Sequence, residues 1–198
     1  MKCFDLQLNG AFGVDFSDPL MTRDDFLRTV NKIFERGITR FLPTIVTSPM
    51  DLYRRNLPLI LKTVEQEGLS YQIPGFHLEG PFICPKPGAV GAHNPAAVLQ
   101  PSPQALNELW EIAQGKVKLL TLAAGLDGSI KTIKAAKKLG ITVTQSNICG
   151  GGAKSPLWKK MMANILGIPV QEIESEEGPG YGGAILAAVG CGEYATVE

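Results

Sequence analysis

The first 145 residues predict an α/β protein built on a parallel β-sheet. Segments with strand character alternate along this part of the chain with segments of helical periodicity. The strands are apolar on both faces, which is typical of parallel strands covered by helices. About five such strand–helix units fit either a doubly wound sheet or part of a barrel.

The first unit has clear boundaries. Residues 3–9 read as a short strand, and Thr22 is expected to cap the next helix because Asp25 follows at capping-box spacing. Gly37 should end that helix. Its apolar stripe, at helical spacing, consists of Phe26, Leu27, Val30, Ile33 and Phe34.

The next units follow the same alternation. A second strand is expected at residues 38–47, and the helix after it should be kinked or interrupted at Pro58. Residues 73–80 form a third strand. Ser102 and Pro103 then make a cap and first-turn pair for another helix.

Two further strands are expected at residues 117–125 and 141–145, joined by a helix that starts at Asp127. The amino-acid composition then becomes rich in glycine, because ten of the 22 glycines lie in residues 146–198. A short strand before a glycine triplet and a second strand at 168–175 predict a separate α/β segment there. The helix after Asp127 carries its apolar stripe on Ile130, Ile133 and Ala136.

Composition narrows the functional classes. With 19 basic and 19 acidic residues the net charge is zero, and no basic stripe favours nucleic acid. No apolar run approaches the roughly 20 residues of a membrane helix, and the first residues lack the apolar core of a signal peptide. The four cysteines form no CxxC pair, which indicates reduced thiols. These features predict a cytoplasmic protein without a membrane partner.

Polar residues stand where the first and third strands end. Gln7 and Asn9 end the first strand, and His77 and Glu79 end the third, with His93 shortly after. Ligand-handling residues of parallel α/β folds lie at such strand ends. A carboxylate near histidines is typical of a metal site, although a catalytic metal takes about three protein ligands. The alternative is a paired Glu79 and a core histidine at position 77.

Several motifs in register carry a resemblance. The segments DLQLNG (5–10), GVDF (13–16), LPTIVTS (42–48), GFHLEGPF (75–82) and GAHN (91–94) resemble N-acetylglucosamine-6-phosphate deacetylases, of the amidohydrolase superfamily. The resemblance covers residues 1–145 and implies an incomplete (β/α)8 barrel of about five βα units with parallel strands.

The same resemblance implies roles for individual residues. Glu79 would ligate a divalent metal, zinc or similar, and Ala92 and His93 would contact an amino-sugar phosphate. Gln7 and Asn9 stand where some relatives carry a histidine pair, and we assign them to substrate binding.

Departures from the family pattern predict a protein that is inactive or nearly so. Gly125 replaces a glutamate of the fourth strand, and both histidines of the chain precede residue 94. The two histidine ligands that the family takes from later strands therefore have no counterpart. The proton-transferring aspartate of the family has none either, because the resemblance ends before the strand that carries it. We expect an amide hydrolase site that is incomplete, with little or no activity.

Residues 146–198 are similar to the C-terminal part of xylulokinase, an FGGY sugar kinase. The resemblance implies a fragment of a sugar-kinase domain in which Gly151, Gly152 and Ser155 contact ATP or ADP. Taken alone, the glycine triplet favours an ordinary turn over a nucleotide site, since glycines are common in turns and the spacing is not that of a P-loop.

The two resemblances meet near residue 146 and predict a chimeric chain with domains at 1–145 and 146–198. Three functional hypotheses follow. The first is a deacetylase-like protein, the second a kinase fragment with residual nucleotide binding, and the third a non-catalytic chimeric product. Exposed edges of a partial parallel sheet also predict a homo-oligomer.

Overall fold

The computed structural model describes residues 3–87, 89–141, 146–148 and 170–172. The chain divides into two compact units, Met1–Thr142 and Val143–Glu198. The domain boundary between residues 145 and 146 stays a prediction.

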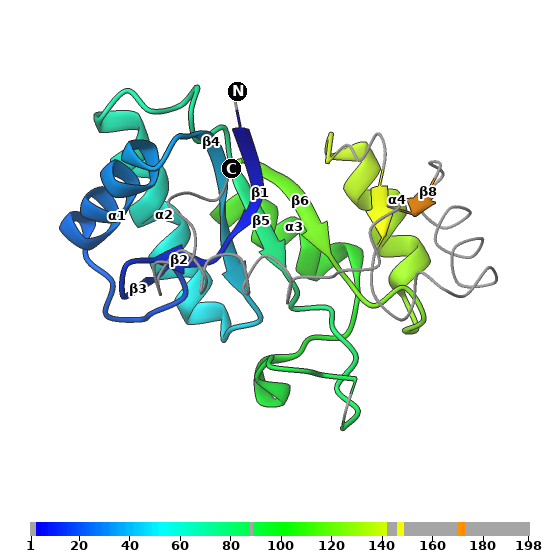
Figure 1. Cartoon of the computed structure of the whole chain (residues 1–198). Helices are drawn as coiled ribbons and strands as arrows, with labels where there is room; N and C mark the ends of the chain where they lie inside the picture. Colours follow the sequence, from blue (N-terminus) through cyan, green and yellow to red (C-terminus); the bar gives the residue numbers. More distant parts are fainter. Residues whose placement is uncertain (1–2, 88, 142–145, 149–169, 173–198) are drawn as a thin grey trace, which may run out of the picture. The chain divides into compact units, whose positions relative to one another are not determined.

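The first unit contains a four-stranded parallel sheet (Figure 1). Its strands are β1 (Cys3–Leu8), β4 (Ile38–Val46), β5 (Phe76–Glu79) and β6 (Val117–Thr121), in that spatial order. The spatial order follows the chain order without reversal. A doubly wound sheet reverses its strand order at a switch point, whereas barrel strands follow one another around the axis. The described strands therefore have the order of a (β/α)8-barrel segment.

Two of the expected helix starts are confirmed. Helix α1 (Arg23–Glu35) begins at a capping box, in which Thr22 and Asp25 bond each other's backbone N–H. Helix α3 (Pro103–Ile112) begins at Ser102, whose Oγ accepts the N–H of Ala105 at 3.1 Å. In both cases a side-chain oxygen satisfies a backbone donor that has no partner inside the helix.

Of the two effects expected of Pro58, the interruption is wrong and the kink stays a prediction. Helix α2 (Met50–Gln66) runs through Pro58 as one element. A proline inside a helix costs about 3 kcal/mol, but apolar side chains are buried on both sides of it. Packing of that face against the sheet outweighs the local preference. The buried apolar residues are Tyr53, Leu57, Ile60, Leu61 and Val64.

The start of the last helix also differs from the expectation. Helix α4 (Ser129–Lys138) begins two residues after Asp127, and its N-cap is Gly128, whose φ of 85° is left-handed. Ile130 is 61% exposed, so its place in the apolar stripe is wrong. The buried face follows the i, i+3, i+4, i+7 spacing from Ser129, and Ile130 lies about 100° away from it. That face consists of Ser129, Thr132, Ile133 and Ala136.

An apolar core packs the strands and helices of the first unit together. The ring centroids of Phe16 and Phe26 lie 5.3 Å apart, and those of Phe16 and Phe41 lie 6.3 Å apart. Two short elements link strands to helices, the hairpin of β2 (Gly10–Ala11) and β3 (Val14–Asp15) and the 3-10 turn η1 (Pro95–Ala97). Among the described residues, no helix is long and apolar enough to cross a membrane.

The second unit is described only by two short strands. β7 (Ser146–Ile148) pairs in parallel with β8 (Val170–Glu172). Both agree with the strands expected before the glycine triplet and within residues 168–175. Ile141 lies outside any strand, and residues 142–145 of the other expected strand lie outside the described residues. The same holds for Gly151, Gly152 and Ser155.

Candidate functional site

Three side chains meet at the carboxyl ends of β1 and β5. Asn9 follows β1, Glu79 ends β5, and His93 lies in the loop beyond. Asn9 Nδ2 donates a 3.0 Å hydrogen bond to Glu79 Oε2, and His93 Nε2 lies 4.0 Å from Glu79 Oε1. The Glu79 and His93 side chains are 21% and 18% exposed. Three of the residues singled out in the sequence are thus neighbours, as parallel strand ends predict.

The turn after β5 holds Glu79 in place. Thr47 Oγ1 donates to the backbone carbonyl of Glu79 at 3.2 Å. Gly80 has a φ of 98°, and a Cβ at this position would overlap Thr47 Oγ1. Only glycine suits both the left-handed backbone and the close approach. The peptide bond between Gly80 and Pro81 is cis.

His93 retains unused hydrogen-bonding capacity. Its backbone N–H donates to the carbonyl of Val90 at 3.2 Å, which positions the residue in its loop. Its Nδ1 is buried and has no partner among the described residues. A buried polar atom without a hydrogen-bond partner lowers the stability of a protein by about 1–3 kcal/mol, so such atoms often bind a ligand or a water molecule. Ala92, beside it, is exposed.

His77 lies inside the sheet and is 2% exposed. Its Nδ1 lies 3.1 Å from the carbonyl of Leu6 and 3.3 Å from Thr44 Oγ1, and its Nε2 lies 2.8 Å from Thr121 Oγ1. These contacts join β5 to β1, β4 and β6. The environment is that of a core histidine, the alternative that the sequence left open.

The hydrogen-bond network assigns the protonation of His77. The Leu6 carbonyl can only accept, and Thr44 Oγ1 donates to the carbonyl of Leu42. Nδ1 therefore carries the proton, and Nε2 accepts from Thr121. Burial lowers the pKa of His77, and the nearby Glu79 carboxylate opposes this only partly. A neutral imidazole satisfies every contact.

Gln7 is not brought to Glu79. It is exposed, and its backbone N–H donates to Asp5 Oδ1 at 2.9 Å. The register of β1 against β4 is irregular between Asp5 and Leu8. Such an irregularity breaks the two-residue alternation of side chains, so Gln7 and Asn9 no longer share one environment. The proposed roles of Gln7 and Ala92 stay predictions.

Sequence reasoning missed the threonines around the site. Thr44, Thr47 and Thr121 bond His77 or the backbone of Glu79. Each lies at or near the carboxyl end of a parallel strand, in LPTIVTS or KLLT. That position is the signal that could have found them, although threonine is common in strands for other reasons.

The described residues do not complete a divalent-metal site. No group of three His, Cys, Asp or Glu side chains that could hold a metal ion occurs among them. Glu79 and His93 offer two donors, whereas a catalytic zinc takes about three protein ligands. Asn9 already occupies one Glu79 oxygen.

A hollow of about 460 Å³ opens beside Asn9. It lies at the carboxyl ends of β1 and β4, against the β2–β3 hairpin. Small-molecule sites commonly measure about 300–1,000 Å³, so this volume suits a sugar phosphate. Its lining consists of Asn9, Gly10, Ala11, Gly13, Val14, Asp15 and Val46.

Most of the chain is similar to N-acetylglucosamine-6-phosphate deacetylases. The chain is 37% identical over 144 residues to the N-acetylglucosamine-6-phosphate deacetylase of Bos taurus, covering 71% of this chain and 34% of that protein. It also matches a solved structure of a mutant deacetylase from Mycobacterium smegmatis in complex with N-acetyl-D-glucosamine-6-phosphate. That match has a TM-score of 0.62 and 28% identity, and covers 73% of this chain and 35% of the other. The chain thus spans about a third of the length of these relatives.

A second similarity concerns the other part of the chain. Residues 122–191 match the C-terminal domain of the FGGY family of carbohydrate kinases. A xylulose kinase of Staphylococcus epidermidis is 39% identical over 67 residues, covering 34% of this chain and 14% of the kinase. The chain therefore joins a segment similar to N-acetylglucosamine-6-phosphate deacetylases to a segment similar to the C-terminal domain of FGGY carbohydrate kinases.

Proposed function

We propose that the first unit recognises an N-acetylated amino-sugar 6-phosphate, as N-acetylglucosamine-6-phosphate deacetylases do, and that the 198-residue chain alone hydrolyses it very slowly. The observation that carries the proposal is the convergence of Asn9, Glu79 and His93 at one sheet end, where His93 Nδ1 has no partner within the described part of the chain. The adjacent hollow and the similarity to deacetylases support it.

The three side chains suit recognition of a polar sugar. Glu79 accepts hydrogen bonds, and its Oε1 is not bonded by Asn9. The His93 imidazole can donate or accept, according to its tautomer. Asn9 holds the carboxylate still, so less conformational freedom is lost when a ligand binds. Sugar hydroxyl and N-acetyl groups have the matching donors and acceptors.

Slow hydrolysis follows from the groups present. Amide hydrolysis needs an activated water and a proton donor for the amine that leaves. Glu79 can act as a general base and His93 as an acid, and a positioned acid or base contributes about 10²–10⁴-fold. A complete deacetylase would also use a metal to activate the water, whereas the described residues do not complete a divalent-metal site. We therefore expect acetate release far below that of a complete deacetylase.

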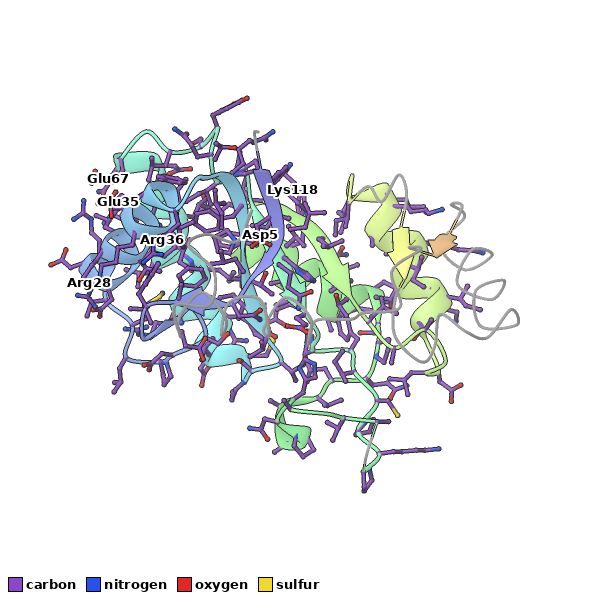
Figure 2. The ribbon with its side chains drawn as sticks, viewed as in Figure 1. Asp5, Arg28, Glu35, Arg36, Glu67 and Lys118 are labelled. Atoms are coloured by element: carbon purple, nitrogen blue, oxygen red, sulfur yellow. The ribbon has the colours of Figure 1, made fainter. Side chains whose placement is uncertain are left out.

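Ligand-observed NMR with N-acetylglucosamine 6-phosphate tests recognition. The unaltered chain should give saturation transfer to the N-acetyl methyl group, and Glu79→Gln and His93→Ala should lose it. Glu35→Gln is the matched control, because Glu35 is an exposed carboxylate at the end of α1 (Figure 2). Absence of transfer to the folded, unaltered chain would refute the proposal. Rapid acetate release that Glu79→Gln abolishes would refute the expectation of slow hydrolysis.

A second candidate function is residual nucleotide binding. The match of residues 122–191 to an FGGY kinase domain favours it. The proposed contacts, Gly151, Gly152 and Ser155, lie outside the described residues. Calorimetry with ADP decides the matter: heat that Gly151→Val removes supports binding, and no heat at millimolar ADP rejects it.

A further inference from the structure

Asn56 is a fully buried residue of α2 whose side chain bonds a segment outside its own helix. Its Nδ2 donates to the carbonyls of Phe16 and Asp18, both at 2.9 Å. Its Oδ1 accepts from Arg55 Nη1 at 2.6 Å. Both amide hydrogens are therefore used, and the two carbonyl partners identify the nitrogen end of the amide.

The segment that Asn56 holds, residues 16–18, follows β3 directly and leads back to the candidate site. The backbone N–H of Phe16 donates to the carbonyl of Asn9 at 2.9 Å. The side chain of Asn9 in turn donates to Glu79 Oε2 at 3.0 Å. The buried amide on α2 is thus connected to the Glu79 carboxylate through Phe16 and Asn9.

A second connection runs through Ser17, which lies between the two carbonyls that Asn56 binds. Ser17 Oγ accepts the backbone N–H of Val46 at 3.0 Å. Val46 ends β4 and is the register partner of Glu79 on β5. Tyr53, one turn before Asn56, donates its hydroxyl to the carbonyl of Val46 at 3.1 Å. Helix α2 therefore fixes both backbone groups of Val46, one directly and one through Ser17.

Packing alone does not require an amide at this position of α2. A buried amide costs stability unless its hydrogen bonds are made. Most of the buried α2 face is apolar, and Leu57 and Ile60 belong to it. Asn56 instead supplies two donors to residues 16–18. Binding sites need such fixing, because functional side chains must lie within about 0.5 Å of the productive geometry.

We propose that Asn56 is a positioning residue of the candidate site. It holds residues 16–18, and through them it sets where Asn9 presents its amide to Glu79, without touching the ligand itself. When these bonds are lost, Asn9 no longer holds the carboxylate, and the sugar must order Glu79 as it binds. That ordering lowers affinity. The inference rests on the proposed function, because it gives Asn56 a role in the same site.

Two measurements on Asn56→Asp in the full chain test the proposal. Aspartate has nearly the same shape, and its ionised form donates no hydrogen bond. The ¹⁵N side-chain amide signal of Asn9, identified by its loss in Asn9→Ala, should move without any ligand present. The Kd for N-acetylglucosamine 6-phosphate should rise about tenfold, which corresponds to one hydrogen bond to a charged group. If Asn56→Asp does not fold, Asn56→Ser serves, because its hydroxyl donates at most one of the two bonds.

Thr63→Ala is the matched control. Thr63 is also buried on α2, and its Oγ1 donates to the carbonyl of Leu59 at 2.8 Å, within the helix. This variant should lose stability in urea but keep the Asn9 signal and the Kd. An unmoved Asn9 signal in the Asn56 variant, or equal changes in Thr63→Ala, would overturn the proposal.

The two readouts separate this inference from the proposed function. If the unaltered chain binds no sugar phosphate, the proposed function fails, while the Asn9 signal still decides whether Asn56 positions Asn9. If the unaltered chain and the Asn56 variant bind the sugar equally tightly, the positioning role fails and the proposed function stands.

Discussion

Asn9 Nδ2 donates a 3.0 Å hydrogen bond to Glu79 Oε2, which links the end of β1 to the end of β5 across 70 residues of sequence. The contact passes over β4, which lies between these strands in the sheet. It orients the carboxylate whose other oxygen faces His93. The hydrogen bond therefore organises the site as well as stabilising the sheet.

Asn9→Ala should lower the free energy of unfolding by about 1 kcal/mol. Hydrogen bonds to charged groups contribute about 1.5–3 kcal/mol, and partial exposure of Glu79 reduces that value. Urea denaturation followed by circular dichroism measures the change. Asn107→Ala, at an exposed position of α3, should cause no loss. Equal losses in both variants would contradict the role given to the Asn9–Glu79 bond.

The stability of the protein should fall below about pH 6.5 because of His77. Burial lowers the folded-state pKa of His77. Above the unfolded-state pKa neither state binds the proton, and His77 contributes no pH dependence. Below it the unfolded chain takes up a proton that the folded chain resists, so unfolding becomes more favourable.

Two histidine variants isolate this effect. His77→Gln should remove a dependence of up to about 1.36 kcal/mol per pH unit between pH 6.5 and the folded-state pKa. His93→Gln should retain it. Denaturant midpoints measured across this pH range provide the comparison, and parallel pH curves for the unaltered chain and His77→Gln would contradict the assignment.

Gly80→Ala should destabilise the protein by about 1–3 kcal/mol, the usual cost of forcing a side chain into a strained backbone conformation. The left-handed φ of 98° and the approach of Thr47 Oγ1 both oppose a Cβ. Gly125→Ala is the control, because a Cβ at that position would meet no atom within 4 Å and the φ of Gly125 is not left-handed. Thermal unfolding that gave equal midpoints for the two variants would refute the argument.

Thr22→Ala should cost about 1 kcal/mol, as loss of a helix N-cap generally does. Thr22 Oγ1 accepts the Asp25 N–H at 3.1 Å, and the Asp25 carboxylate accepts the Thr22 N–H at 3.2 Å. Thr22→Ser keeps the hydroxyl and should retain most of the stability. Chemical denaturation of both variants checks this, and an equal loss in each would exclude capping as the cause.

The local features of the first unit could be predicted from the sequence. The capping box at Thr22 depends on residues three positions apart, so a short stretch of sequence specifies it. The predicted interruption at Pro58 was wrong because contacts with residues far away in the sequence decide the course of this helix. Burial of the α2 face against distant strands outweighs the local cost of proline, and single-sequence patterns do not measure that burial.

Some features of the candidate site could likewise be predicted from the sequence, and others could not. The meeting of Glu79 with Asn9 follows from parallel strands ending at one edge, which sequence periodicity predicts. The partners of His77 could not be predicted, because they depend on the register of four strands. The exposure of Gln7 depends on an irregularity in β1 that its alternating pattern does not reveal.

Imidazole NMR of the two histidines tests the central claim most directly. The chain contains two histidines, so ¹³C-labelled histidine gives one ring signal for His77 and one for His93. The account predicts that N-acetylglucosamine 6-phosphate shifts the His93 signal in a saturable manner and leaves the buried His77 signal unchanged. Unmoved signals at millimolar sugar phosphate, or a shift confined to His77, would contradict it.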